Sequence, residues 1–343
     1  MDELGNHDVA DDIITLGFAA RLLLTNLDRD IIINRAIERM ADFGISNRVG
    51  LFLYNTEGDL QCVGGFIHSN TERRFFSLEL EGAPWSKIMA DKSYDYFNVK
   101  YVEDIPIPVN EGGIQDRKCL CAPLIAANNR VIGLVSFDYT TDFTLPLIMI
   151  QSLLLLLTII AVALETARLF QQAVYDGLTG LYVRRYFDLR LAEEENRIKR
   201  YGGRMALLML DIDHFKSIND RHGHQEGDTV LCQVANIILS SIRHNLDMPC
   251  RYGGEEFVVI MTDTDLAGAL IVAERIRHSI QNHIFKTAEG PIHVTLSGGV
   301  AFTDQQGFVT GQELLKNADN ALYRAKDNGR NQIQVWERQT YRK

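Results

Sequence analysis

The 343-residue chain has little of what marks fibrous, disordered or disulfide-bonded proteins. Its 7 prolines and 26 glycines are too few for a long low-complexity linker. With 46% hydrophobic and 23% charged residues, the composition excludes a collagen, a coiled-coil rod and a disordered chain. The 5 cysteines are scattered and odd in number, which indicates reduced thiols and not a disulfide framework. What remains is a globular protein of about two domains.

An excess of positive charge is also lacking. The net charge of −10 argues against a general nucleic-acid binder. Through Gln171, 14 Lys and Arg stand against 23 Asp and Glu, whereas 21 stand against 22 in the remainder. The second half therefore has enough basic residues to bind an anionic small molecule. Residues 1–12 are acidic and polar, unlike a signal peptide, and we expect a cytoplasmic protein.

One long uncharged run, residues 145–164, stands apart from this soluble pattern. It is long enough to span a bilayer. The alternative is a helix that is apolar all round because it packs on its own domain and on a partner subunit. Gln151, Ser152 and Thr158 interrupt the run, which continues without a loop into an amphipathic segment. We favour the buried dimerisation helix and expect no membrane span.

The first half predicts an antiparallel α+β domain. Apolar residues at helical spacing cover residues 11–45, and residues 48–67 read as a hairpin. Residues 118–140 read as two further strands joined by an Asn-Asn turn. A long helix is expected from about Leu145 to Tyr175.

This first half resembles the GAF family of small-molecule sensor domains. The resemblance rests on the VGLFLYNTEGDL hairpin, the RVIGLVSFD strand and an exit helix ending in AVALETARLFQQA. It implies a sensor for an unidentified small molecule, and a ligand-free dimerisation module is the alternative.

The second half predicts the element order β-α-α-β-β-α-β-α-β, a split βαβ or ferredoxin-like arrangement. A buried strand, MALLMLDID, ends in acidic residues. Residues 214–228 are expected to form a polar connection, and a helix is expected to follow from Thr229. The segment RYGGEEFVVIM is expected to be a hairpin that turns on its two glycines.

Carboxylates cluster at two of these turns. Asp211 and Asp213 lie at the end of an apolar strand and share one face, so at least one of them can hold a hard cation. Glu255 and Glu256 follow Gly253 and Gly254, where the missing Cβ atoms let a phosphate approach the backbone. Carboxylates on adjacent strands beside a glycine turn suit metal-assisted phosphoryl transfer.

Other candidates have simpler alternatives. Lys326 and Arg330 bracket the end of the last long helix, where basic residues also favour the helix dipole. Asn219 and Asp228 lie in the predicted polar connection, and Asp228 is also suited to cap the following helix.

Four ordered motifs then make the second half resemble the diguanylate cyclase (GGDEF) family. They are DGLTGLYVRRYF, LDIDHFKSINDRHGHQEGD, RYGGEEF and ADNALYRAKDNGRN, and they span about residues 174–338. The family condenses two GTP into cyclic di-GMP, with one GTP on each subunit of a homodimer. The resemblance therefore implies a Mg²⁺-dependent (or Mn²⁺-dependent) nucleotidyltransferase.

The resemblance also implies roles for individual residues. Asp211 and Glu255 would be catalytic and would bind the metal with the carbonyl of Ile212. The remaining implied positions bind substrate. Asn219 and Asp228 would contact the guanine, and Gly253 and Gly254 would accommodate the ribose and α-phosphate. Lys326 and Arg330 would hold the terminal phosphates, and Lys216 would also bind substrate.

The product-inhibition motif of the family, Arg-x-x-Asp, is degenerate here. The window has His244 at the arginine position and Asp247 at the aspartate position, with Arg243 one place out of register. If the helix is regular there, Arg243 points about 100° away. We expect weak or absent product inhibition through this surface.

The expected organisation is an N-terminal helical extension (1–26), a GAF-like sensor (27–165), a linker helix (166–175) and a cyclase domain (176–341). Two alternatives remain for the activity: a catalytically silent receptor for GTP or cyclic di-GMP, and a synthase of mixed cyclic GMP-AMP. The intact Asp211, Glu255 and Glu256 argue against the receptor. Asp228 argues against the mixed synthase, because adenine has no donors that match it.

Overall fold

The computed structural model describes residues 27–42, 48–55, 57–67, 84–99, 117–139, 146–288, 290–303 and 310–336, with the single positions 17 and 25. The expected N-terminal extension, residues 1–26, lies outside these ranges apart from those two positions. The chain divides into two compact units, Met1–Phe170 and Gln171–Lys343. The domain boundaries expected from the sequence stay predictions.

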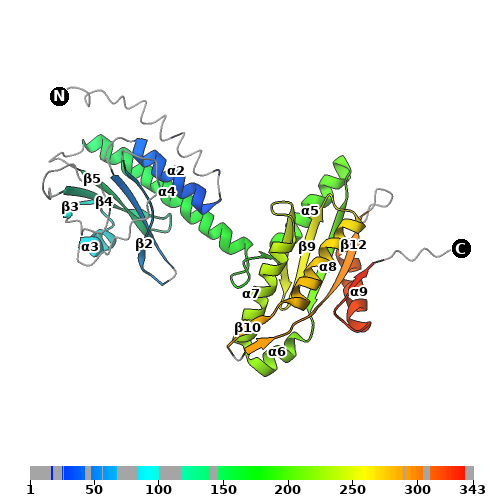
Figure 1. The fold of residues 1–343 in the computed structure, drawn as a ribbon. Helices are drawn as coiled ribbons and strands as arrows, with labels where there is room; N and C mark the ends of the chain where they lie inside the picture. Colours follow the sequence, from blue (N-terminus) through cyan, green and yellow to red (C-terminus); the bar gives the residue numbers. More distant parts are fainter. Residues whose placement is uncertain are drawn as a thin grey trace. The chain divides into compact units, whose positions relative to one another are not determined.

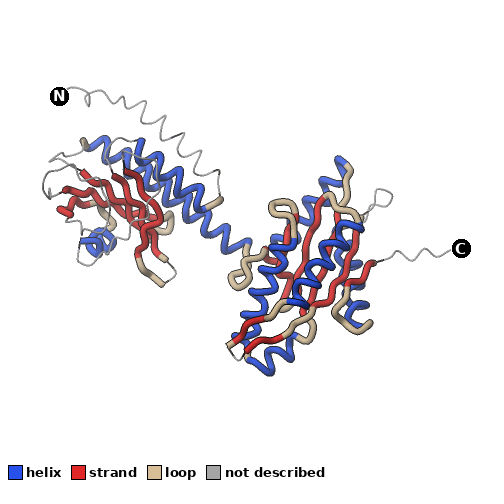
Figure 2. Tube along the Cα trace, viewed as in Figure 1, coloured by secondary structure: helices blue, strands red, loops and turns tan. Residues whose placement is uncertain are grey.

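The first unit is built on a five-stranded antiparallel sheet in the order β2-β1-β5-β4-β3 (Figures 1 and 2). Its strands are β1 (Arg48–Tyr54), β2 (Leu60–Ile67), β3 (Asp95–Val99), β4 (Arg117–Ile125) and β5 (Val131–Tyr139). Its helices are α2 (Arg29–Asp42), α3 (Pro84–Asp91) and α4 (Leu147–Val174). Both predicted hairpins and the long helix are confirmed, whereas β3 was not expected.

The side-chain alternation of the strands divides the core of this unit into two parts. Val49, Leu51 and Leu53 of β1 pack with α2 and α4 on one face of the sheet. Phe52, between them in sequence, packs on the opposite face with Ile88 of α3. The period of two along a strand therefore lets one sheet bury helices on both of its faces.

Helix α4 is long and apolar enough to cross a membrane by length and composition, and 44% of its most apolar window is buried inside the protein. Its buried residues, among them Leu153, Leu157 and Leu164, belong to the core of the first unit. Packing on the sheet thus accounts for the buried part of the apolar run.

The second unit has a six-stranded mixed sheet in the order β13-β12-β7-β9-β8-β6. Its strands are β6 (Tyr182–Val183), β7 (Met205–Ile212), β8 (Asp247–Gly253), β9 (Glu256–Thr262), β12 (Leu296–Phe302) and β13 (Ile333–Val335). A separate two-stranded sheet holds β10 (Phe285–Thr287) and β11 (Gly290–Ile292). The helices are α5 (Arg184–Tyr201), α6 (Phe215–His222), α7 (His224–Ser241), α8 (Leu266–Asn282) and α9 (Gly311–Asp327).

The four central strands, β12-β7-β9-β8, are antiparallel to one another, and their connectivity fits the expected split βαβ arrangement. Strand β7 lies in the middle and is buried along its whole length. Helix α9 packs closely on β12, since a Cβ at Gly299 would overlap the backbone of Ala318 and Leu322. This packing holds the end of α9 near the end of β7.

The prediction of a polar connection over residues 214–228 was wrong. Residues Phe215–His222 form α6, and α7 begins at His224 after a break at Gly223. Buried Phe215 and half-buried Ile218 anchor α6 to the core, and tertiary packing of these two residues outweighs the polar composition of the segment. The short elements β6, β10 and β11 were also not expected.

Candidate active site

The sheet brings three carboxylates to one place. Asp211, at the end of β7, is paired in register with Glu256 at the start of β9. The backbone N–H of Ile212 points to the carbonyl of Glu255 at 3.4 Å. The sequence predicted that carboxylates of adjacent strands meet here, and the register of β7 with β9 brings them together.

Asp211 is buried, at 7% exposure, and its charge is only partly compensated. Burial raises the pKa of its carboxyl, and the negative charges of Glu255 and Glu256 raise it further. The ammonium of Lys326 opposes this rise, with Nζ 2.7 Å from Asp211 Oδ2. A buried carboxylate beside two others is a strong site for a cation.

A tight turn borders this cluster. Gly253 ends β8, Gly254 has a φ of +31°, and the β8–β9 register shifts between Arg251 and Gly253. A Cβ at Gly254 would meet no heavy atom within 4 Å, so the space beside the turn is open. The open turn leaves room for a ligand to approach the backbone, as predicted.

Two basic residues come from the end of α9. Lys326 lies in its last turn and contacts Asp211, so its place in the structure is explained by that ion pair and not by the helix dipole alone. Arg330 is exposed, in a left-handed conformation with a φ of +64°, just after Gly329 at +107°. Lys326 and Arg330 therefore come from the last turn of α9 and from the loop that follows this helix.

Asn219 and Asp228 come from two neighbouring helices. Asn219 lies on α6, and its side-chain Oδ1 is buried without a hydrogen-bond partner among the described residues. A Cβ at Gly227 would overlap this Oδ1, so α7 approaches Asn219 at a glycine. Asp228 is exposed inside α7; the alternative that it caps this helix was wrong, because α7 begins four residues earlier. Lys216 is exposed on α6.

The donor set fits a hard divalent cation held jointly by protein and substrate. Within the described part of the chain, no group of three or more His, Cys, Asp and Glu side chains could hold a metal by itself. Asp211, Glu255 and the carbonyl of Ile212 are oxygen donors, which suit Mg²⁺. Mg²⁺ commonly takes one or two carboxylates and completes its shell with phosphates and water, so a nucleotide would supply the missing ligands.

Asp213 differs from Asp211 in its hydrogen-bond partners, although by sequence either could hold a cation. Its Oδ1 accepts a hydrogen bond from Ser297 Oγ at 2.7 Å, and its Oδ2 accepts from Thr295 Oγ1 at 2.7 Å and from the backbone N–H of Asn331 at 3.0 Å. The carboxylate is thus engaged by protein donors, and Asp211 is the member of the pair left for a cation.

The predicted inhibitory residues lie between α7 and β8 and not on a helix: Arg243 and His244 precede the strand, and Asp247 is its first residue. Helix α7 ends at Ser241, so the premise of a regular helix at Arg243 was wrong. The Arg243 guanidinium donates to Asp247 Oδ1 at 2.6 Å, to the carbonyl of Thr262 at 2.7 Å and to Thr264 Oγ1 at 2.8 Å. These contacts hold Arg243 and the fully buried Asp247 side chain together.

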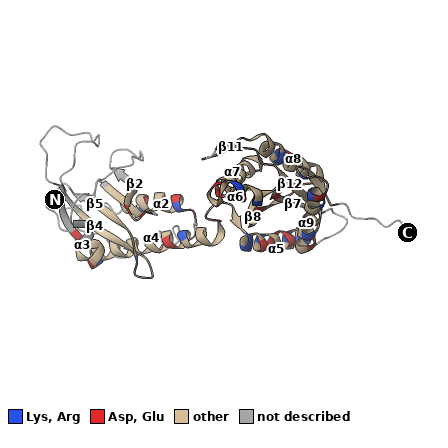
Figure 3. Ribbon diagram, turned by 90° about the horizontal axis from the view of Figure 1, so that it is seen from below, with Lys and Arg blue, Asp and Glu red and all other residues tan. Residues whose placement is uncertain are grey.

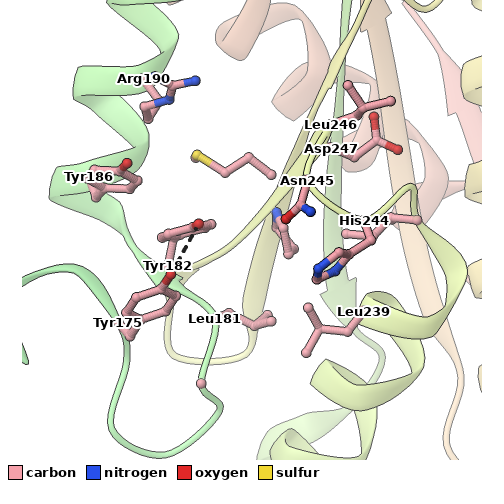
Figure 4. A pocket seen from close by; sticks show the side chains of 14 residues that line it. Tyr175, Leu181, Tyr182, Tyr186, Arg190, Leu239, His244, Asn245, Leu246 and Asp247 are labelled. Atoms are coloured by element: carbon pink, nitrogen blue, oxygen red, sulfur yellow. Dashed lines mark hydrogen bonds between the residues drawn. The ribbon is translucent and has the colours of Figure 1, made fainter. Parts of the chain in front are cut away.

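A cavity of about 470 Å³ opens beside this turn (Figure 4). Its polar lining includes His244 and Asn245 from the turn and Arg190 from α5. Tyr182 stacks between Tyr175 and Tyr186, with ring centroids 4.7 and 4.9 Å away. The degenerate motif therefore borders a cavity that is also lined by the basic side chain of Arg190.

Sequence reasoning missed two polar contacts that support the site. Arg251 joins Asp176 to the Gly254 turn, and Asp213 joins β7 to the loop after α9. Arg251 stands in the quoted RYGGEEF motif and Asp176 in DGLTGLYVRRYF, so a pairing of opposite charges between the two motifs was the available signal.

Comparison with known proteins agrees with this geometry. Residues 173–332 match the family described as "Diguanylate cyclase, GGDEF domain". This segment is a GGDEF domain. It contains the carboxylate cluster, the glycine turn, Lys326 and Arg330, so the candidate site described above lies within the matched segment.

The GGDEF domain carries the similarity to curated relatives. The chain is 48% identical over 163 residues to the response regulator PleD of Caulobacter vibrioides, covering 47% of this chain and 36% of that protein. It is 39% identical over 176 residues to diguanylate cyclase A of Treponema denticola, covering 50% and 47%. The matched segments thus span between about a third and a half of the relatives' length.

Among solved structures, the GGDEF domain of DgcB from Caulobacter crescentus in complex with c-di-GMP is 34% identical. That match covers 48% of this chain and 94% of the DgcB chain, with a TM-score of 0.46.

Proposed function

We propose that this protein is a diguanylate cyclase, which condenses two GTP into cyclic di-GMP and releases pyrophosphate. The observation that carries the proposal is the buried Asp211 beside Glu255 and Glu256, next to an open glycine turn and the ammonium of Lys326, within a GGDEF domain. This arrangement collects the groups that phosphoryl transfer needs: metal-binding oxygens, an accessible backbone and cations.

Each residue of the site has a role in this proposal. Asp211, Glu255 and the carbonyl of Ile212 hold Mg²⁺ or Mn²⁺, which neutralises charge on the reacting phosphate. Glu255 lies near the 3′-hydroxyl that must lose a proton, and Gly253 and Gly254 leave space for the ribose and α-phosphate. Lys326 and Arg330 bind the terminal phosphates, which releases Lys326 from Asp211.

Selection of guanine rests on α6 and α7. Guanine presents N–H donors at N1 and N2, and the buried Oδ1 of Asn219 is an acceptor with no partner in the described part of the chain. The Asp228 carboxylate adds a second acceptor from the next helix, and adenine would leave both without matching donors.

The reaction needs two GTP sites face to face, so we propose a homodimer with C₂ symmetry. Helix α4 carries an uncharged face that suits this role; its only charged residues are Glu165 and Arg168 (Figure 3). Exposed positions recur along it at intervals of three or four, as in a coiled-coil seam. They are Ile148, Gln151, Leu155, Thr158, Thr166, Leu169 and Ala173, with half-buried Val162 between them.

The structure changes which leucines of α4 are available for such a seam. Leu153, Leu156, Leu157 and Leu164 are buried in the first unit, whereas Leu155 and Leu169 are each 52% exposed. The seam proposed here therefore runs along the face opposite the sheet and not through the buried leucines of the same run.

We further propose that the first unit is a GAF-like sensor that regulates the cyclase from the cytoplasm. Its five-stranded antiparallel sheet with helices on both faces suits such a domain. The chemistry of a small-molecule ligand is left to experiment, and a ligand-free dimerisation module is the competing possibility.

Purified full-length protein incubated with GTP and Mg²⁺, with and without ATP, tests the activity. We expect cyclic di-GMP and pyrophosphate, identified by mass, and no product from Glu255→Gln. GTP binding without turnover would instead show a silent receptor, and cyclic GMP-AMP in the presence of ATP would show a mixed synthase.

A further inference from the structure

Asp213 is buried, at 5% exposure, yet its hydrogen-bond partners within the described part of the chain are all uncharged. Two of them, Thr295 and Ser297, lie at the start of β12, and the third is the backbone N–H of Asn331. The backbone N–H of Asp213 also donates to the carbonyl of Thr295 at 2.9 Å. One carboxylate thus fastens the end of β7 to β12 and to the loop that follows α9.

That loop has an unfavourable backbone, so it needs external support. Gly329, Arg330 and Asn331 have φ values of +107°, +64° and +46°, and the left-handed region is costly for the two residues with a Cβ. Asn331 is held from two sides, by Asp213 at its N–H and by Arg277 Nη1, 2.9 Å from its Oδ1. Gln332 Nε2 adds a bond to the carbonyl of Asn328 at 2.8 Å.

The same loop carries half of the proposed phosphate site. Arg330 is the residue next to Asn331, and Lys326, one helical turn earlier, contacts Asp211. Asp211 and Asp213 are separated only by Ile212. The bond from Asp213 to Asn331 therefore joins the strand end that holds the metal-binding carboxylate to the loop that holds the phosphate-binding cation.

We propose that Asp213 is a positioning residue that fixes Arg330 relative to Asp211 and so prepares the site for the triphosphate of GTP. This inference rests on the proposed function for the identity of the nucleotide. Asp213 touches neither metal nor substrate; it acts through Asn331 and the loop.

The hydrogen-bond pattern separates two substitutions of Asp213. Asp213→Ala removes all three bonds and leaves the Asn331 N–H without its acceptor. Asp213→Asn keeps an amide oxygen for Thr295 and Asn331 and places its NH₂ beside Ser297, whose hydroxyl can accept as well as donate. The asparagine variant should therefore retain most of the positioning.

Calorimetric titration of the full chain with Mg²⁺ and a non-hydrolysable GTP analogue tests the proposal, with GMP as the ligand that lacks terminal phosphates. We expect Asp213→Ala to weaken binding of the analogue by roughly ten- to a hundredfold, to leave GMP binding unchanged, and Asp213→Asn to restore most of the affinity. Thr303→Val is the matched control. It removes a buried hydroxyl that accepts from Met205 N–H at the other end of β7 at 3.0 Å, so it should lower stability without changing nucleotide affinity.

A double-mutant cycle with Arg330→Ala decides whether Asp213 acts through this loop. In the Arg330→Ala background, Asp213→Ala should cost little further affinity, and additive losses would overturn the proposal. So would equal losses for GMP and the GTP analogue, or an affinity of Asp213→Ala equal to that of the wild type.

Hydrogen exchange gives a reading that does not depend on the activity. The amides of residues 328–332 should lose protection in Asp213→Ala while those of β7 stay protected, and unchanged protection would overturn the link. If the wild type binds no GTP analogue, the proposed function fails, and the exchange data still decide whether Asp213 holds the loop.

Discussion

Arg251 and Asp176 form an ion pair that connects the first turn after α4 to the glycine turn at Gly253 and Gly254. Arg251 Nη1 lies 3.1 Å from Asp176 Oδ1, and its Nε donates to the carbonyl of Gly254 at 3.0 Å. Burial opposes ionisation of Asp176, but hydrogen bonds from Thr179 and Arg251 hold the pKa of its carboxyl below its ordinary value. One guanidinium thus joins its own turn to Asp176, which lies 75 residues earlier in the chain.

Replacing Arg251 tests the importance of this connection. Arg251→Ala should lower the free energy of unfolding by about 1–3 kcal/mol, because it removes charge-assisted hydrogen bonds from a mostly buried pair. Cyclic di-GMP synthesis should slow as well, since the Gly254 turn loses its support. Urea denaturation and initial rates measure the two effects.

Arg204→Ala is the control for Arg251→Ala. Arg204 pairs with Asp265 through side chains that are 51% and 57% exposed, so its loss should cost less than about 1 kcal/mol. Equal stability losses in the two variants would contradict the structural role of Arg251.

The buried carboxylate of Asp211 should be required for catalysis and should lower the stability of the metal-free protein. Asp211→Asn should abolish turnover, because the metal loses a charged ligand. Without metal it should melt at the same or a higher temperature than the wild type at neutral pH, since the raised pKa means that the folded protein disfavours the ionised form. This penalty is complete above the folded pKa and disappears as the pH falls toward the ordinary value of 3.8.

Melting curves of Asp211→Asn and the wild type, recorded in chelator from neutral pH down to about the ordinary pKa of 3.8, measure the difference in stability. The gap in melting temperature should narrow as the solution becomes more acidic. An asparagine variant that is less stable than the wild type at neutral pH would show that the Lys326 ion pair outweighs the cost of burial.

Charges placed on the exposed face of α4 should separate the subunits. Leu155→Glu combined with Leu169→Glu should give monomers by light scattering and a lower specific activity, because one subunit holds one GTP. Ile271→Glu, at a 65% exposed position of α8, should leave the oligomeric state unchanged. Dimers that persist in the double variant would locate the interface elsewhere, and partition of the wild type into membranes would favour a spanning helix.

Product inhibition should be weak, because Arg243 is already bound within the protein. Its bonds to Asp247 raise the pKa of the guanidinium and engage its Nε and Nη2 donors. His244→Arg should restore a free guanidinium at the motif position and tighten cyclic di-GMP binding by about ten- to a hundredfold, as expected for a charge-assisted bidentate contact. Isothermal titration of the full chain with cyclic di-GMP measures the change.

Arg243→Ala serves as the counterpart in that experiment. It should lower stability and leave product affinity as it is, since Arg243 supports the turn and does not line the adjacent cavity. Tight binding by the wild type that disappears in Arg243→Ala would show that the displaced arginine still builds an inhibitory site.

Local patterns were enough to place most strands and the long helix, and to predict the carboxylates and the glycine turn of the candidate site. The strand that ends in Asp211 and the turn at Gly253 could be recognised because apolar runs and glycine pairs act through neighbouring residues. The six-stranded order and the exposed face of α4 could not, because register and burial depend on residues far apart in the chain.

The differences between like residues were decided by tertiary contacts alone. Asp211 and Asp213 are the same residue type two positions apart, yet one faces Lys326 and the other is bonded by Thr295, Ser297 and Asn331. Their partners come from positions more than 80 residues away, which no spacing rule connects to them. The sequence was therefore enough to select Asp211 and Asp213 as candidates. Only the packing of β12 and α9 against β7 determined which of the two carboxylates is left for a metal.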